Sequence, residues 1–157
     1  MSPAEPSGLQ VLVQSPLAVR VASVGVSAIA AIPLGLAFRV DADPSGHGTH
    51  TQLGLAPCTI LSTTGYPCPM CGATTSWALM AHLHPFQAFY NQPFGATLFL
   101  LAVAAVALGV AEALLPRQRW SRLAALVARH DRSIGGSVLL LMFVGWTWKL
   151  ALMQGWV

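Results

Sequence analysis

The sequence contains very few charged residues. Only 8% of its 157 residues are charged and 55% are hydrophobic, whereas roughly a quarter of the residues of a soluble domain are charged. The mean hydropathy of +0.63 agrees with this composition. These values argue against a soluble domain and predict an all-α membrane protein whose main partner is the lipid bilayer.

The sequence also lacks the pattern of a nucleic-acid-binding protein. Its pI near 9.1 comes from a handful of arginines in one loop, and aromatic and basic residues are not interleaved as they are on nucleic-acid platforms. We therefore expect no nucleic-acid partner.

Three apolar runs have the length of a membrane-spanning helix, which is about 20 residues. They cover residues 21–38, 93–115 and 134–153. A cleaved signal peptide is the competing interpretation of the first run, because a basic residue precedes it. The run lies about 20 residues from the start and no clean small-x-small cleavage pattern follows it, so we expect the helix to be retained.

A basic segment between the second and third runs predicts the orientation. Residues 116–133 contain five arginines and one acidic residue, and short loops rich in Lys and Arg stay in the cytoplasm. The N-terminal tail, residues 1–20, is then cytoplasmic. The loop at 39–72 lies outside the bacterial inner membrane, which the chain crosses several times.

Two charged residues lie within the apolar runs. Glu112 is close enough to the end of its run to snorkel to the cytoplasmic interface. Lys149 stands beside Trp146 and Trp148, a cluster that suits the headgroup zone.

The segment between the first two runs divides into two parts. Residues 39–72 are rich in Gly, Pro, Ser and Thr and predict an ordered loop with little regular structure. Residues 73–91 are too short and too mixed to span a membrane, so they predict a helix that lies at the surface or re-enters the membrane. Pro85 should end or kink its first piece.

The chain has only three cysteines, Cys58, Cys68 and Cys71, all in this loop. The extracytoplasmic side of a bacterial membrane is oxidising, so disulfides can persist there. Cys68 and Cys71 immediately precede the predicted helix, and a helix N-terminus lowers the pKa of a thiol. The odd number leaves one thiol free if a single disulfide forms.

Three chemistries fit these cysteines, and the sequence leaves them open. The first is a structural disulfide that pins the loop. The second is thiol–disulfide redox chemistry with Cys58 as a resolving thiol, although neither a thioredoxin-like alternation of strands and helices nor the four-helix core with a quinone partner of membrane disulfide-forming enzymes is evident. The third is a zinc site, which needs four ligands; the candidates are Cys58, Cys68, Cys71, His50 and His82.

The stretch "YPCPMCGATTSWALMAHLHPFQAFYNQPFGATLFL", with the preceding "GTHTQLGLAPC", resembles the domain of unknown function 2752 family. These small bacterial membrane proteins are built around a Cys-Pro-x-Cys-Gly-x-Thr motif. The matching positions here are Cys68, Pro69, Cys71, Gly72 and Thr74. Many members of the family have an arginine after the threonine, where this chain has Thr75. The resemblance implies a cysteine-bearing element between membrane spans and implies no reaction.

We therefore expect an integral membrane protein of unknown biochemical activity, whose Cys-x-x-Cys loop is a structural or interaction module that contacts another membrane protein. No catalytic residue is assigned, and the pattern leans away from an enzyme. The alternative is a membrane thiol–disulfide redox protein or a zinc-binding protein that uses Cys58, Cys68 and Cys71.

Overall fold

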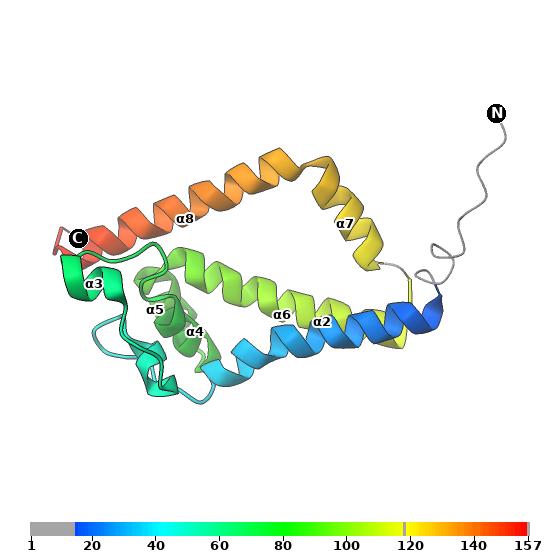
Figure 1. Cartoon of the computed structure of the whole chain (residues 1–157), viewed down its shortest axis with the longest axis horizontal. Helices are drawn as coiled ribbons and strands as arrows, with labels where there is room; N and C mark the ends of the chain where they lie inside the picture. The colour runs from blue at the N-terminus through cyan, green and yellow to red at the C-terminus, as the bar shows by residue number, and fades with distance from the viewer. Residues whose placement is uncertain (1–14, 118, 157) are drawn as a thin grey trace.

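The structure is a computed structural model that describes residues 15–117 and 119–156 (Figure 1). Within these ranges the chain is helical and forms no strand. The elements in chain order are α2 (Pro16–Ala37), the 3-10 helix η1 (Thr49–Leu53), α3 (Thr59–Thr64), α4 (Ala73–Ala81), α5 (Pro85–Asn91), α6 (Pro93–Leu114), α7 (Arg119–Arg129) and α8 (Asp131–Met153).

Three of these helices, α2, α6 and α8, are long and apolar enough to cross a membrane. The all-α membrane class predicted from the sequence is confirmed. Helices α2 and α6 lie side by side along most of their length, whereas α8 approaches α6 at one end and splays away from it toward α7 (Figure 1).

The first long helix begins at Pro16, before the expected start at Val21. Ser15 explains the difference, because its hydroxyl oxygen accepts a hydrogen bond of 3.2 Å from the backbone N–H of Ala18. Proline suits the next position, since an N–H there would have no helical partner.

The basic segment 116–133 is mostly helical. Helix α7 occupies its middle, and α8 begins at Asp131 rather than at Ile134. An acidic residue in the first turn of a helix is favourable because it faces the positive end of the helix dipole.

The residues between α2 and α6 fold into a helical cap at one end of the long helices, which contains η1, α3, α4 and α5 (Figure 1). Residues 39–72, predicted to have little regular structure, contain the short helices η1 and α3 and are otherwise irregular. The break expected at Pro85 is confirmed: α4 ends at Ala81, and Leu83 in the linker has φ 63°. The cap and α7 lie at opposite ends of the long helices (Figure 1).

Small residues bring α2 and α6 into close contact. A Cβ atom added at Gly109 would collide with the Ser27 side chain and would lie 3.0 Å from the carbonyl oxygen of Ser23. Close approach of this kind is how small residues support helix association in membranes.

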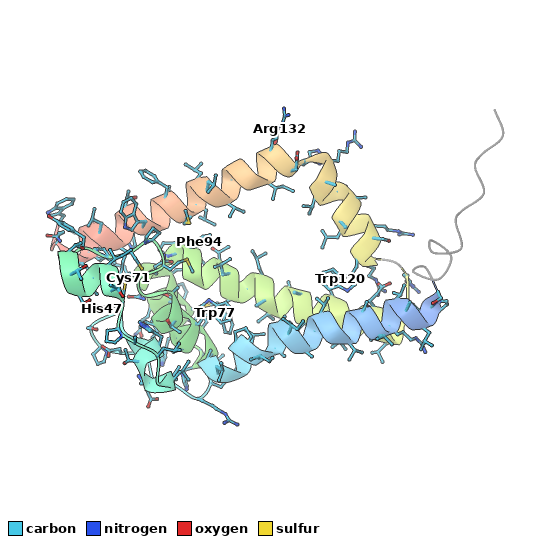
Figure 2. All side chains as sticks on the ribbon, viewed as in Figure 1. His47, Cys71, Trp77, Phe94, Trp120 and Arg132 are labelled. Carbon is cyan, nitrogen blue, oxygen red and sulfur yellow. The ribbon has the colours of Figure 1, made fainter. Side chains whose placement is uncertain are left out.

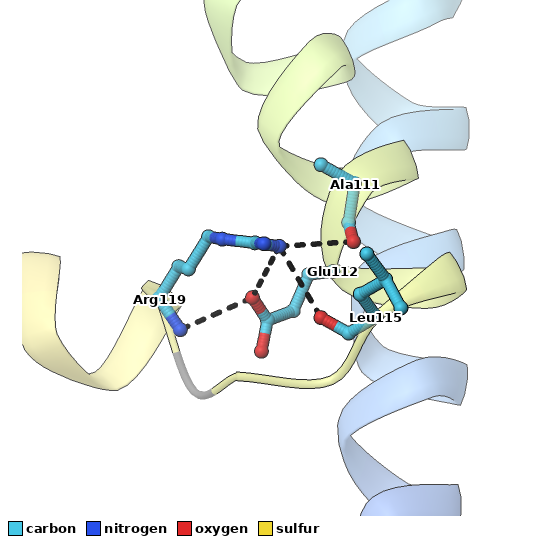
Figure 3. A network of polar contacts seen from close by, with 4 residues as sticks. All are labelled: Ala111, Glu112, Leu115 and Arg119. Atoms are coloured by element: carbon cyan, nitrogen blue, oxygen red, sulfur yellow. Dashed lines mark hydrogen bonds and ion pairs between the residues drawn. The ribbon is translucent and has the colours of Figure 1, made fainter.

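The carboxylate of Glu112 is fully buried and does not snorkel, which corrects the expectation above. Its Oε2 accepts a hydrogen bond of 3.1 Å from the Arg119 backbone N–H, and Arg119 Nη1 lies 3.4 Å away. The same Nη1 donates to the carbonyl oxygens of Ala111 and Leu115 (Figure 3). Arg119 therefore binds one oxygen of the buried acid and also the Leu115 carbonyl oxygen at the end of α6.

Candidate functional site

The three cysteines line one cavity of about 420 Å³ in the cap, and all three are free thiols. Cys58 immediately precedes α3. Cys68 and Cys71 bound a tight turn, in which the Cys71 N–H donates to the Cys68 carbonyl oxygen at 2.9 Å. The cavity is also lined by His47 and His50, and Figure 2 shows His47 and Cys71 at the same end of the molecule. The fold thus gathers a thiol from the start of α3 and two thiols from one turn.

Cys58 and Cys68 form an interacting pair with opposite pKa shifts. A backbone hydrogen bond at Leu61, in the first turn of α3, is the main cause that lowers the pKa of Cys58, and the neighbouring Cys68 thiol lowers it further. Burial is the main cause that raises the pKa of Cys68, and the neighbouring Cys58 adds to that shift. Of the two thiols, Cys58 therefore loses its proton first, and Cys68 keeps its proton.

Cys71 is the least accessible thiol, with 6% of its surface exposed. Burial raises its pKa to about 11, the Cys68 charge adds to this effect, and Lys149 partly offsets it. The expectation that the N-terminus of α4 lowers the pKa of Cys68 and Cys71 is wrong, because the cost of removing a thiolate from water exceeds the stabilisation offered by the helix end.

Lys149 of α8 reaches into the cap and is only 3% exposed. Its Nζ donates to the Gly46 carbonyl oxygen and to Asn91 Oδ1, each at 2.7 Å. The ammonium group is therefore bound by the protein itself. We call this arrangement of Lys149, Gly46 and Asn91 the lysine clamp.

Gly72, a residue of the cysteine motif, allows the lysine clamp to close. Its φ is +84°, and an added Cβ would lie 2.7 Å from the Gly46 carbonyl oxygen and 3.0 Å from Asn91 Nδ2. The Gly72 carbonyl oxygen accepts a hydrogen bond of 3.0 Å from the same Asn91 Nδ2. Both the backbone conformation and the available space therefore require glycine here.

Buried hydroxyls extend the polar contacts around the start of α4. Thr49 and Thr75 share a hydrogen bond of 2.8 Å between their hydroxyl oxygens. The Ser76 hydroxyl donates to the Ala88 carbonyl oxygen at 2.9 Å and accepts from Asn91 Nδ2 at 3.0 Å. These contacts join η1, α4 and α5 without any charged group.

Gln92, which caps the start of α6, and Trp146 of α8 bind carbonyl oxygens of the cysteine turn. Gln92 Nε2 donates to Pro69 at 3.2 Å, and the Trp146 indole donates to Pro67 at 2.8 Å. Thr74, the last residue of the motif, lines the thiol cavity. Hydrogen bonds from two side chains therefore hold the turn in place without a disulfide.

The two candidate histidine ligands lie apart. His50 lines the cavity, and its Nε2 is 3.1 Å from the Ala56 carbonyl oxygen. His82 is exposed, and its Nδ1 is 2.9 Å from the Ala78 carbonyl oxygen. In the described part of the chain, no three His, Cys, Asp or Glu side chains are grouped so that they could hold a metal ion. The zinc hypothesis therefore has no preformed site there.

Sequence reasoning missed the lysine clamp. One signal was available, because Lys149 is the only lysine of the chain and it lies in an apolar run, where an ionisable residue has a role by default. No local pattern identified its partners Gly46 and Asn91.

The fold and the site define an integral membrane protein with a thiol-lined cap. Residues 58–106 match the sequence model of a family described as a protein of unknown function, DUF2752. This match confirms the resemblance over a stretch that includes all three cysteines, α4 and α5. No curated protein and no solved structure matches the chain.

We predict that iodoacetamide alkylates the thiols in the order Cys58, Cys68, Cys71, because the reaction needs an accessible thiolate. The Cys58 rate should reach half its maximum below the ordinary thiol value of 9.0, since its pKa is lowered. The Cys71 rate should still be rising there, since its pKa is about 11. Peptide mass spectrometry across a pH series measures all three rates in the unmodified protein.

The same protein unfolded in detergent and urea is the control, in which the three rates should converge. Alkylation of folded Cys71 as fast as Cys58 would contradict the assignment.

Proposed function

We propose that the protein is a membrane thiol–disulfide exchange protein that uses Cys58 and Cys68. The observation that carries the proposal is that both thiols line one cavity, with the pKa of Cys58 lowered and that of Cys68 raised. Exchange needs one thiolate to attack and a second thiol nearby to resolve the product. This pair has both features.

The exchange proceeds in two balanced steps. The Cys58 thiolate attacks a sulfur of a disulfide on a partner, which forms a mixed disulfide and releases the first partner thiolate. The Cys68 thiol then loses its proton and attacks the Cys58 sulfur, which releases the second partner thiolate. The two thiolates take up protons, so the partner gains two electrons and the Cys58–Cys68 disulfide forms.

The second candidate is the structural or interaction module expected from the sequence. Two apolar side chains support it, because Leu83 in the linker between α4 and α5 and Phe86 in α5 are 85% and 90% exposed. Such residues suit contact with the membrane or with another membrane protein. A purely structural disulfide is less well supported, since Gln92 and Trp146 already hold the cysteine turn.

The proposed location is the bacterial inner membrane, with the cap outside the cytoplasm. The arginines of α7 support this orientation, because cytoplasmic loops carry the excess of basic residues. The cap lies at the opposite end of the three long helices from α7 (Figure 1). The outer compartment is oxidising, so partner disulfides are available there.

The exchange is tested with the reduced full-length protein in mild detergent and oxidised glutathione. Wild type should lose two free thiols and Cys71 should stay free. In Cys58→Ser the exchange should fall to the uncatalysed rate, because the attacking thiolate is absent. Cys68→Ser should accumulate a glutathione adduct on Cys58, because nothing resolves it.

Cys71→Ser should still form the Cys58–Cys68 disulfide, which distinguishes this pairing from a Cys68–Cys71 bridge. Thr63→Ala, on the exposed surface of α3, is the matched control and should exchange as wild type does. Equal exchange in Cys58→Ser and wild type would refute the proposal.

The orientation is tested in intact bacterial cells with a membrane-impermeant maleimide. Cys58 should be labelled without lysis, because the cap faces outward. The matched control is Ser133→Cys at the start of α8, whose introduced thiol should be labelled only after lysis. The reverse pattern would place the cap in the cytoplasm.

A further inference from the structure

The ammonium group of Lys149 has a donor that the lysine clamp does not use. The side chain is 3% exposed and has three N–H donors, of which two bind Gly46 and Asn91. In the part of the chain that the structure describes, the ammonium group makes no third hydrogen bond and no ion pair. Cys71 is not a counter-ion, because its pKa of about 11 keeps it protonated at neutral pH. A buried charge is costly unless it is paired, so the remaining donor fits an anionic oxygen.

Lys149 lines a cavity of about 430 Å³ between the cap and the end of α8, which we call the lysine cavity. Its walls come from residues 42–46, from α4 and α5, and from the last turn of α8, where Leu152 and Met153 contribute apolar surface. Figure 1 shows this end of α8 beside the cap. The volume lies within the roughly 300–1,000 Å³ of small-molecule sites.

The lysine cavity is also lined by a carboxylate, that of Asp43. Hydrogen bonds from the hydroxyl and the backbone N–H of Ser45 lower the pKa of Asp43, so it is negatively charged at neutral pH. Its Oδ1 accepts both of these bonds, whereas its Oδ2 has no hydrogen-bond partner among the described residues. No ion pair joins Asp43 to Lys149 in that part of the chain. The cavity therefore presents one charge of each sign without an ion-pair partner.

The lysine cavity lies where lipid head groups are expected. Leu152 and Met153 are among the last residues of the membrane-spanning helix α8. Tyr90 lines the cavity, and its ring packs against Trp148 with the centroids 5.8 Å apart. Tyrosine and tryptophan are enriched at the interface between membrane and water. The charged and the apolar walls of the cavity thus match a ligand that is part head group and part acyl chain.

We propose that the lysine cavity binds a phosphoethanolamine group, the head group of a zwitterionic membrane lipid. The phosphate accepts the remaining N–H of Lys149, and the ammonium group of the ligand binds Oδ2 of Asp43. The Gln87 and Tyr90 side chains, which also line the cavity and make no hydrogen bond to any described residue, are further donors for the phosphate. This site is distinct from the thiols, and the inference does not rest on the proposed exchange.

The two charges select a zwitterionic ligand over an anionic one. A head group with a phosphate alone, such as that of phosphatidylglycerol, satisfies Lys149 but brings a net negative charge to Asp43. A site discriminates between ligands when the wrong one creates a repulsion of this kind. The lysine cavity should therefore prefer phosphatidylethanolamine to phosphatidylglycerol.

The test uses the full-length protein, delipidated in mild detergent, and native mass spectrometry with phosphatidylethanolamine or phosphatidylglycerol of the same acyl chains. Wild type should bind one phosphatidylethanolamine and should need about tenfold more phosphatidylglycerol for half saturation, a difference of 1.4 kcal/mol. Glycerophosphoethanolamine, which has no acyl chains, is the soluble probe. If it displaces phosphatidylethanolamine at equal concentration, the source of the bound group is a soluble compound; if it does not, the source is the lipid.

Asp43→Asn should bind both lipids alike, because it removes the negative charge and keeps an oxygen that accepts from Ser45. Asp41→Asn is the matched control, because it makes the same change at an exposed residue of the same loop that does not line the cavity. It should keep the wild-type preference. Leu152→Phe fills the cavity and should raise the half-saturating concentration of phosphatidylethanolamine by about tenfold, whereas Leu140→Phe, on the exposed surface of α8, should leave it unchanged.

The inference is overturned if wild type binds neither lipid or binds both alike. It is also overturned if Asp43→Asn shows the same preference as Asp41→Asn, or if a folded Leu152→Phe binds phosphatidylethanolamine as Leu140→Phe does. Where Leu152→Phe does not fold, the comparison of the two aspartate variants decides.

Discussion

The ammonium group of Lys149 is the constraint on which the cap depends. It is buried, and it binds the carbonyl oxygen of Gly46 and the side-chain oxygen of Asn91 rather than a carboxylate. A buried charge is costly unless it is fully hydrogen-bonded, so the clamp is stable only when both acceptors are in place. The cost of burying the ammonium group therefore holds the end of α8 against the loop that contains Gly46 and against α5.

The lysine clamp also sets the environment of the thiols. Gly72 can sit against Gly46 only because it lacks a side chain, and that contact brings Cys71 into the interior. The turn before it places Cys68 beside Cys58, which lies in another part of the cap. Burial thus raises the pKa of Cys71, while the backbone at the start of α3 lowers the pKa of Cys58. The contrast arises from the packing of the cap and not from the spacing of the motif.

The sequence was sufficient for the membrane class, the three spans and the break at Pro85, because these depend on local hydropathy and backbone chemistry. It was insufficient for α3, whose polar, Thr-rich sequence resembles a loop. It did not identify the burial of Lys149 and Glu112, because each binds specific partners that hydropathy does not register. The Lys149 bond to Gly46 joins residues 103 positions apart. The pKa shifts depend on burial and on a backbone hydrogen bond, which the sequence pattern does not specify.

The most direct test measures the alkylation rate of Cys71 in Lys149→Met, with Leu139→Met on the exposed surface of α8 as the matched control. Methionine keeps an apolar side chain of similar length but leaves both acceptors of the clamp unsatisfied. The cap should then open more often, and the Cys71 rate should rise by about tenfold or more, since the reactivity of a buried group follows the population of the open state. A Cys71 rate equal to that of wild type and Leu139→Met would show that the cap holds together without the lysine clamp.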